Sequence, residues 1–255
     1  MVLKIRTFLN IFIAVFLFCC SATTVNAKVY AVCVGVNKYK ERDIPPLKYA
    51  ESDANSFTTF LNSVAPSASI TMLTGSDATK DNIVNALTKY ANLATSNDVI
   101  MFYFSGHGLG GGMAVYDTKS TKTCLRYRDL SNILKKSKVK NKFIFADTCH
   151  SGSGRLAKSN KDDSSHLNKQ NILLFLSSRD NETSIENRFE GYGIFTRHLL
   201  DGLRGKADSN KDKLVTAIEL FQYVSPQVIS ETGKRQHPVM WGNFDPNIVL
   251  MRLSR

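Results

Sequence analysis

The sequence predicts an α/β fold built on a parallel sheet with helices on both faces. Unbroken apolar runs of strand length alternate with stretches of helical spacing along the chain. Apolar runs that lack polar alternation are typical of strands buried on both faces. We expect strands at 29–36, 69–73, 98–104, 143–146, 172–176 and 247–253. We expect helices at 47–64, between 79 and 93, and at 126–136, 193–203 and 216–228.

The first 27 residues have the features of a secretory signal peptide. Lys4 and Arg6 precede an apolar run over 8–20, and the Val-Asn-Ala sequence at 25–27 fits the rule for cleavage after small residues. The apolar run is shorter than the roughly 20 residues that a transmembrane helix needs. An uncleaved anchor and a lipoprotein signal through Cys20 are the alternatives. We expect an exported protein, periplasmic or secreted, with no stable membrane span after cleavage.

Residues 28–255 are expected to form one domain, because no change of composition divides them. The segment 155–170 is polar and lacks periodicity, which is typical of an exposed linker. The formal charge is +11, but the basic residues are scattered and do not alternate with aromatic residues, so we expect no nucleic-acid partner. Cleavage of the signal would leave Cys33, Cys124 and Cys149. Their odd number leaves at least one thiol free or in an intermolecular bridge, and Cys33 lies in an apolar run typical of the core.

Two of the predicted strands end in polar turns that contain candidate catalytic residues. Strand 98–104 is followed by Ser-Gly-His107-Gly108, and strand 143–146 by Asp-Thr-Cys149-His150. If the strands are parallel neighbours, both turns lie at the carboxyl edge of the sheet, where ligands bind in open α/β folds. A nucleophilic thiol needs a base, and His107 can supply it. His150 competes, but neighbouring side chains in extended chain point in opposite directions.

These two motifs resemble those of a known family. Tyr-Phe-Ser-Gly-His-Gly around His107 and Phe-Ala-Asp-Thr-Cys-His-Ser-Gly around Cys149 are similar to the histidine and cysteine motifs of caspase-like cysteine peptidases. The cysteine motif looks like that of metacaspases and their bacterial relatives, and differs from the Gln-Ala-Cys pattern of animal caspases. The resemblance covers almost all of 28–252.

The resemblance implies a caspase-like three-layer sandwich around a mostly parallel, six-stranded sheet. Residues 28–154 would form a large-subunit-like part, and residues 171–255 a small-subunit-like part. His107 would be the base and Cys149 the nucleophile. Gly108 would lie beside the oxyanion, where the peptide N–H groups of Gly108 and Cys149 are candidate donors.

The resemblance also implies a substrate pocket formed by Asp53, Ser105 and Asp147, because metacaspases line their pocket for Arg or Lys with these residue types. Two carboxylates can pair with a guanidinium and would repel each other in an empty pocket. The alternative is that Asp147 caps a turn and that Asp53 lies on a helix surface. Ala50 stands where many metacaspases have cysteine, so the pocket wall differs.

We therefore expect a cysteine endopeptidase that cleaves protein or peptide substrates after Arg or Lys. The linker 155–170 contains four basic residues and is a candidate for self-processing. Two alternatives stay open: an inactive caspase-like scaffold that binds partners through the same cleft, and another cysteine hydrolase of related fold. The chemistry requires no cofactor.

Calcium is the one metal that the sequence suggests. Asp208, Asn210, Asp212, Thr216 and Glu219 occupy the positions of oxygen ligands in an EF-hand-like loop. The sixth position of the loop, where the turn favours glycine, is a lysine. The alternative is a polar turn between two helices, whose Asp and Asn residues serve turn chemistry.

Overall fold

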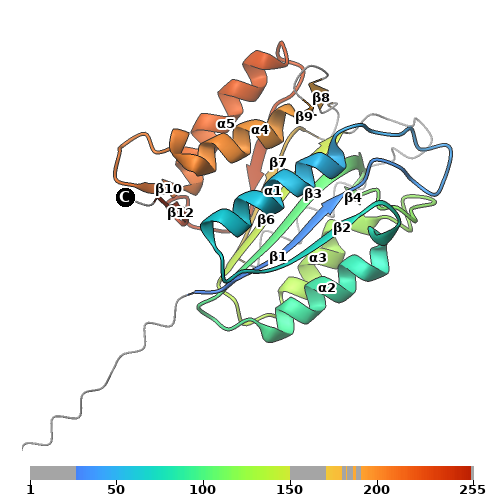
Figure 1. Ribbon diagram of the computed structural model, residues 1–255, viewed down its shortest axis with the longest axis horizontal. Coiled ribbons are helices and arrows are strands. Elements are labelled where there is room, and N and C mark those ends of the chain that lie inside the picture. Colours follow the sequence, from blue (N-terminus) through green and yellow to red (C-terminus); the bar gives the residue numbers. More distant parts are fainter. Residues whose placement is uncertain (1–26, 150–170, 180–181, 183–185, 188–190, 254–255) are drawn as a thin grey trace, which may run out of the picture.

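The computed structural model describes residues 27–149, 171–179, 182, 186–187 and 191–253. Six strands follow one path through its central sheet, in the order β11-β7-β6-β3-β1-β2 (Figure 1). Every neighbouring pair is parallel except β11 and β7, which are antiparallel. The mostly parallel sheet predicted from the apolar runs is therefore confirmed. The strands are β1 Val29–Gly35, β2 Ser69–Thr74, β3 Val99–Leu109, β6 Asn141–Cys149, β7 Ile172–Leu176 and β11 Val239–Trp241.

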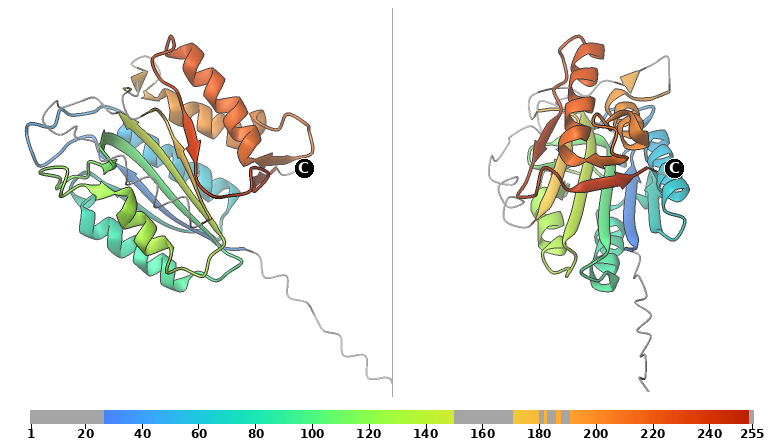
Figure 2. Two further views of the ribbon diagram at one scale, coloured as in Figure 1. Left: turned by 180° about the vertical axis from the view of Figure 1, so that it is seen from behind. Right: turned by 90° about the vertical axis from the view of Figure 1, so that its left-hand side faces the viewer.

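Helices cover both faces of this sheet and complete three layers, as the views from behind and from the side also show (Figure 2). One face carries α1 Ala50–Val64, α4 Ile194–Asp201 and α5 Ala217–Glu231 (Figure 1). The other face carries α2 Lys80–Leu93 and α3 Tyr127–Leu134. Each face has its own hydrophobic core, because successive strand residues point to opposite sides.

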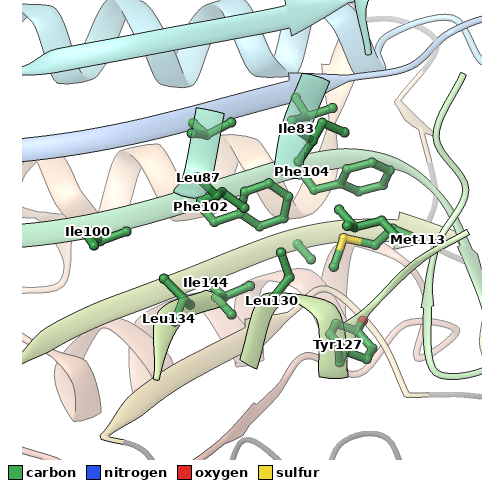
Figure 3. Close-up of a cluster of buried hydrophobic side chains, with 14 of the residues drawn as sticks. Ile83, Leu87, Ile100, Phe102, Phe104, Met113, Tyr127, Leu130, Leu134 and Ile144 are labelled. Atoms are coloured by element: carbon green, nitrogen blue, oxygen red, sulfur yellow. The ribbon is translucent and has the colours of Figure 1, made fainter. Parts of the chain in front are cut away.

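Strand β1 shows how the two cores arise. Ala31 and Cys33 belong to the core under α1, α4 and α5, whereas Val32 and Val34 belong to the core under α2 and α3. All four side chains are fully buried, which explains why the run lacks polar residues. Figure 3 shows the α2 and α3 side, where side chains of both helices meet those of β3 and β6.

The helix boundaries follow local capping chemistry. The Thr79 hydroxyl accepts the Asn82 N–H at 3.3 Å and starts α2, close to the predicted position. Thr216 and Glu219 form a capping box at the start of α5. Helix α1 begins three residues later than predicted, because the loop before it is tied to Asn37: the Leu47 N–H donates to the Asn37 carbonyl at 2.8 Å.

The predicted C-terminal strand does not enter the sheet. Strand β12, Val249–Arg252, instead pairs antiparallel with β10, Leu214–Thr216. The sixth place is taken by β11, which sequence reasoning missed because three residues are too few to show a strand pattern. Smaller pairs are formed by β4 Gly112–Met113 with β5 Leu125–Arg126 at the end of β3, and by β8 Glu186–Asn187 with β9 Tyr192–Gly193.

The predicted signal peptide, apart from its last residue, and the predicted linker 155–170 lie outside the described residues. Both therefore stay predictions. Within the described part of the chain, no helix has the length and apolar character needed to cross a membrane.

Candidate active site

Strands β3 and β6 carry the two sequence motifs side by side. They pair in parallel from Val99↔Asn141 through to His107↔Cys149. The sequence predicted that both strands end at their last apolar residue, and this was wrong. Backbone pairing does not depend on side-chain polarity, so the ladder continues through the polar motifs. The register places His107 directly opposite Cys149.

Tyr39 and Pro45 hold His107 in place. Its backbone N–H donates to the Tyr39 hydroxyl at 2.9 Å, and its ring stacks on the Tyr39 ring at 5.3 Å between centroids. Its Nε2 lies 2.8 Å from the Pro45 carbonyl oxygen. A carbonyl only accepts hydrogen bonds, so Nε2 carries the proton in the neutral ring and Nδ1 holds the lone pair. This arrangement leaves Nδ1 as the atom that can accept a proton.

Sequence reasoning assigned no role to Tyr39 or Pro45. The two residues precede His107 by more than 60 positions, and no spacing rule links them to it. Gly108 follows His107 in β3 and pairs with Met113 of β4, so its peptide lies at the junction of the sheet and this small arm. The oxyanion role of the Gly108 and Cys149 N–H groups stays a prediction.

The structure brings Asp53, Ser105 and Asp147 together from α1, β3 and β6. The Ser105 hydroxyl donates to Asp53 Oδ2 at 2.9 Å, and Ser105 lies opposite Asp147 in the β3–β6 register. Asp53 is 2% exposed and Asp147 is 4% exposed. The alternative interpretation of Asp53 as a helix-surface residue is therefore wrong.

The segment that starts α4 supplies donors to both carboxylates. The Gly193 N–H donates to Asp53 Oδ1 at 2.9 Å. The Thr196 N–H and hydroxyl donate to Asp147 Oδ2 at 3.3 and 2.8 Å. Asp147 thus accepts hydrogen bonds from the first turn of α4. Sequence reasoning placed this segment at the start of the expected helix 193–203 and gave it no role in the site.

The pKa of Tyr103 responds to the two acids. This fully buried tyrosine donates or accepts a hydrogen bond with the Thr196 hydroxyl at 2.6 Å. Its pKa is raised well above its usual value of 10, first by burial and then by the charges of Asp53 and Asp147.

Gly193 lies between the two acids, and its small size is what allows their approach. A Cβ at Gly193 would overlap Asp147 Oδ2 and lie 2.9 Å from Asp53 Oδ2. The φ of Gly193 is −69°, a value open to any residue, so space and not backbone conformation requires glycine.

Replacing Gly193 with Ala is therefore expected to force the acids apart. We expect a loss of about 1–3 kcal/mol in unfolding free energy from overpacking. We also expect a higher KM for arginyl peptides. Gly191→Ala is the matched control: its Cβ meets no atom within 4 Å, and only its φ of +78° strains the backbone. Denaturant unfolding and steady-state kinetics of both variants check this; an unchanged KM in Gly193→Ala would contradict it.

The residues predicted to bind calcium mainly hydrogen-bond within their own loop. Asp208 Oδ1 and Oδ2 accept the N–H groups of Asp212 and Lys213, and Asn210 Oδ1 accepts the N–H of Asp212. Glu219 caps α5. Among the described residues, no three or more His, Cys, Asp or Glu side chains are grouped to hold a metal ion. Calcium binding therefore stays a prediction without support from this arrangement.

Cys33 is a core residue, as predicted. It is fully buried, and burial raises the pKa of its thiol to about 12. Burial therefore disfavours the thiolate, the form that reacts with alkylating agents. We expect Cys33 to resist iodoacetamide in the folded protein and to react in urea. Peptide mass mapping checks this, and rapid alkylation of native Cys33 would refute it.

A model of the caspase domain, that of peptidase family C14, matches residues 28–246. The chain belongs to the caspase-domain family. This confirms the resemblance read from the His107 and Cys149 motifs, and it supports a cysteine-peptidase type of function in general. No curated protein matches the chain.

Two solved structures show the same fold. A structural-genomics protein of Geobacter sulfurreducens aligns with a TM-score of 0.66 and 19% identity, over 89% of this chain and 100% of that one. The structure of pro-Sf-caspase-1 aligns with a TM-score of 0.66 and 13% identity, over 88% of this chain and 95% of that one. The caspase-like three-layer architecture predicted from the resemblance is therefore confirmed.

Proposed function

We propose that this caspase-domain protein is a cysteine endopeptidase with a Cys149–His107 dyad. The observation that carries the proposal is the β3–β6 register, which places His107 opposite Cys149. A further support is the orientation of the histidine ring, whose Nε2 lies 2.8 Å from the Pro45 carbonyl. That contact leaves Nδ1 as the proton acceptor.

In the proposed reaction the Cys149 sulfur attacks the carbonyl carbon of the scissile peptide while His107 accepts the thiol proton. The C–N bond breaks as His107 returns that proton to the leaving amine. Water then hydrolyses the thioester, which releases the carboxylic acid and regenerates the thiol. The Gly108 and Cys149 N–H groups are the proposed donors to the oxyanion in both steps. Both groups lie in the β3–β6 ladder, so this role requires them to leave their ladder bonds when substrate binds.

We propose further that cleavage follows Arg or Lys. The support is the pair of buried carboxylates, Asp53 and Asp147, which Gly193 allows to approach each other. Like charges in a buried site repel, and a guanidinium or ammonium group between them would relieve that repulsion. An aspartyl side chain would instead add a third negative charge.

Turnover of matched arginyl, lysyl and aspartyl reporter peptides by residues 28–255 tests both proposals. We expect hydrolysis of the arginyl and lysyl peptides and none of the aspartyl peptide. Preference for the aspartyl peptide would refute the specificity. Absence of any thiol-dependent hydrolysis would favour the scaffold alternative.

Self-processing within 155–170 and export to the periplasm or medium are proposals that rest on sequence alone. Intact mass after incubation, compared with Cys149→Ala, tests the first. An unchanged mass in the active protein would reject it.

A further inference from the structure

Strand β6 continues beyond the point at which β7 stops pairing with it. The last backbone pair of β6 with β7 is Ala146↔Leu176, and the Ser177 N–H then donates to the Ala146 carbonyl at 2.9 Å. Residues 147–149 extend past this point, although they remain paired with β3 on their other side. The segment that carries the pocket acid and the proposed nucleophile thus lacks a β-ladder on its β7 side.

Two serine hydroxyls replace the missing ladder. The Thr148 N–H donates to Ser177 Oγ at 3.0 Å, and the Ser177 hydroxyl lies 3.3 Å from the Thr148 carbonyl oxygen as a donor. The Ser178 hydroxyl donates to the same carbonyl at 3.2 Å. All three residues are fully buried, so water does not compete for these bonds. Both backbone polar groups of Thr148 are therefore held by side chains.

Gln236 hydrogen-bonds to the backbone of Ser177. Its side-chain Nε2 donates to the Ser177 carbonyl at 2.9 Å, and its own N–H donates to the Thr232 hydroxyl at 3.2 Å. Gln236 is fully buried and lies just before β11. The turn between α5 and β11 is thereby connected, through one serine residue, to the peptide that precedes Cys149.

Because a peptide group is rigid, fixing the Thr148 carbonyl also fixes the direction of the Cys149 N–H. The peptide is planar and trans, so its C=O and the following N–H point in opposite directions. Because the Thr148 carbonyl faces the two serines on the β7 side, the Cys149 N–H faces β3, the side on which Gly108 lies. A rotation of this peptide would move the Cys149 N–H and, on the other side of Thr148, the pocket acid Asp147.

We propose that Ser177 and Ser178, backed by Gln236, are positioning residues that hold the Thr148–Cys149 peptide in the orientation needed for acyl transfer. The inference rests on the proposed peptidase function and deepens it. The hydroxyls touch neither substrate nor reacting atoms. They act through the backbone of the residue before the nucleophile.

Ser177→Ala and Ser178→Ala in the purified protein test the proposal. We expect kcat for an arginyl peptide to fall by about ten-fold with little change in KM, less than the roughly 10²–10³-fold cost of losing an oxyanion donor outright. Ser178→Cys keeps a donor group at this position but donates weakly, so its kcat should lie between those of the wild type and Ser178→Ala. Ser63→Ala is the matched control, because it removes a hydroxyl–carbonyl bond of 2.7 Å to Phe60 at the far end of α1.

Amide hydrogen exchange of the peptide covering 141–149 gives a readout that needs no activity. We expect faster exchange than in the wild type in both alanine variants, and exchange at the wild-type rate in Ser63→Ala. Wild-type exchange in this peptide, or wild-type kcat in folded variants, would overturn the positioning role. If the wild type itself hydrolyses no peptide, the proposed function fails, and the exchange result still decides whether the serines hold the Thr148–Cys149 peptide.

Discussion

Replacing His107 with Ala is expected to lower kcat for arginyl peptides by about 10²–10⁴-fold, the usual contribution of a general base. With Nε2 donating to the Pro45 carbonyl, Nδ1 is the ring nitrogen that can accept the thiol proton. The KM should change little, because Asp53 and Asp147 are held by hydrogen bonds to Ser105 and Thr196 that do not involve His107. Steady-state kinetics at several pH values measure the effect.

A double variant distinguishes a dyad from two independent residues. If His107 and Cys149 act as one unit, His107→Ala combined with Cys149→Ala should be no slower than Cys149→Ala alone. Additive losses would contradict the dyad. Tyr39→Phe is a milder comparison, because it removes only the hydroxyl that accepts the His107 N–H and keeps the stacked ring.

The second large effect is expected at the acid pair. Asp53→Asn and Asp147→Asn keep the shape of each side chain but remove its charge. Truncating one partner of a buried charge pair costs about 2–5 kcal/mol, so kcat/KM for arginyl peptides should fall by roughly 30-fold to several thousand-fold. The effect should be confined to cationic substrates.

The unfolding temperature of these variants distinguishes a substrate-binding role of the acids from a purely structural one. In the free protein two buried carboxylates repel each other, so each Asn variant should unfold at the wild-type temperature or above it. If the acids only hold the first turn of α4, both variants should be less stable by about 1–3 kcal/mol. Asp81→Asn is the control, an exposed acid in the first turn of α2. Thermal unfolding and kinetics of all three variants decide between the two outcomes.

The sequence was sufficient to predict the sheet and the two motifs because both signals are local. An apolar run such as that of β7 is typical of a buried strand, and the glycines beside His107 and near Cys149 mark the points where the apolar runs give way to polar residues. The parallel pairing of β3 and β6 then follows from the alternation of strands and helices. The sites of Asp53 and Ser105 came from the family resemblance.

The remaining parts of the site depend on contacts between distant segments, which no local pattern records. Tyr39 and Pro45 meet His107 across more than 60 residues, and Gly193 meets Asp53 across 140. Side-chain hydroxyls that replace a ladder, as at Ser177, read in the sequence as an ordinary turn. Strand β11 is too short to be recognised without its partner β7.

Covalent labelling tests the central claim most directly. A peptidyl-arginine electrophile with an acyloxymethyl ketone group is incubated with the reduced protein, and the adduct is located by mass spectrometry. The account predicts one adduct, on Cys149, absent from Cys149→Ala and strongly reduced in Asp147→Asn. It also predicts no adduct with the matched aspartyl reagent. An unlabelled wild-type protein, or equal labelling by both reagents, would contradict the account.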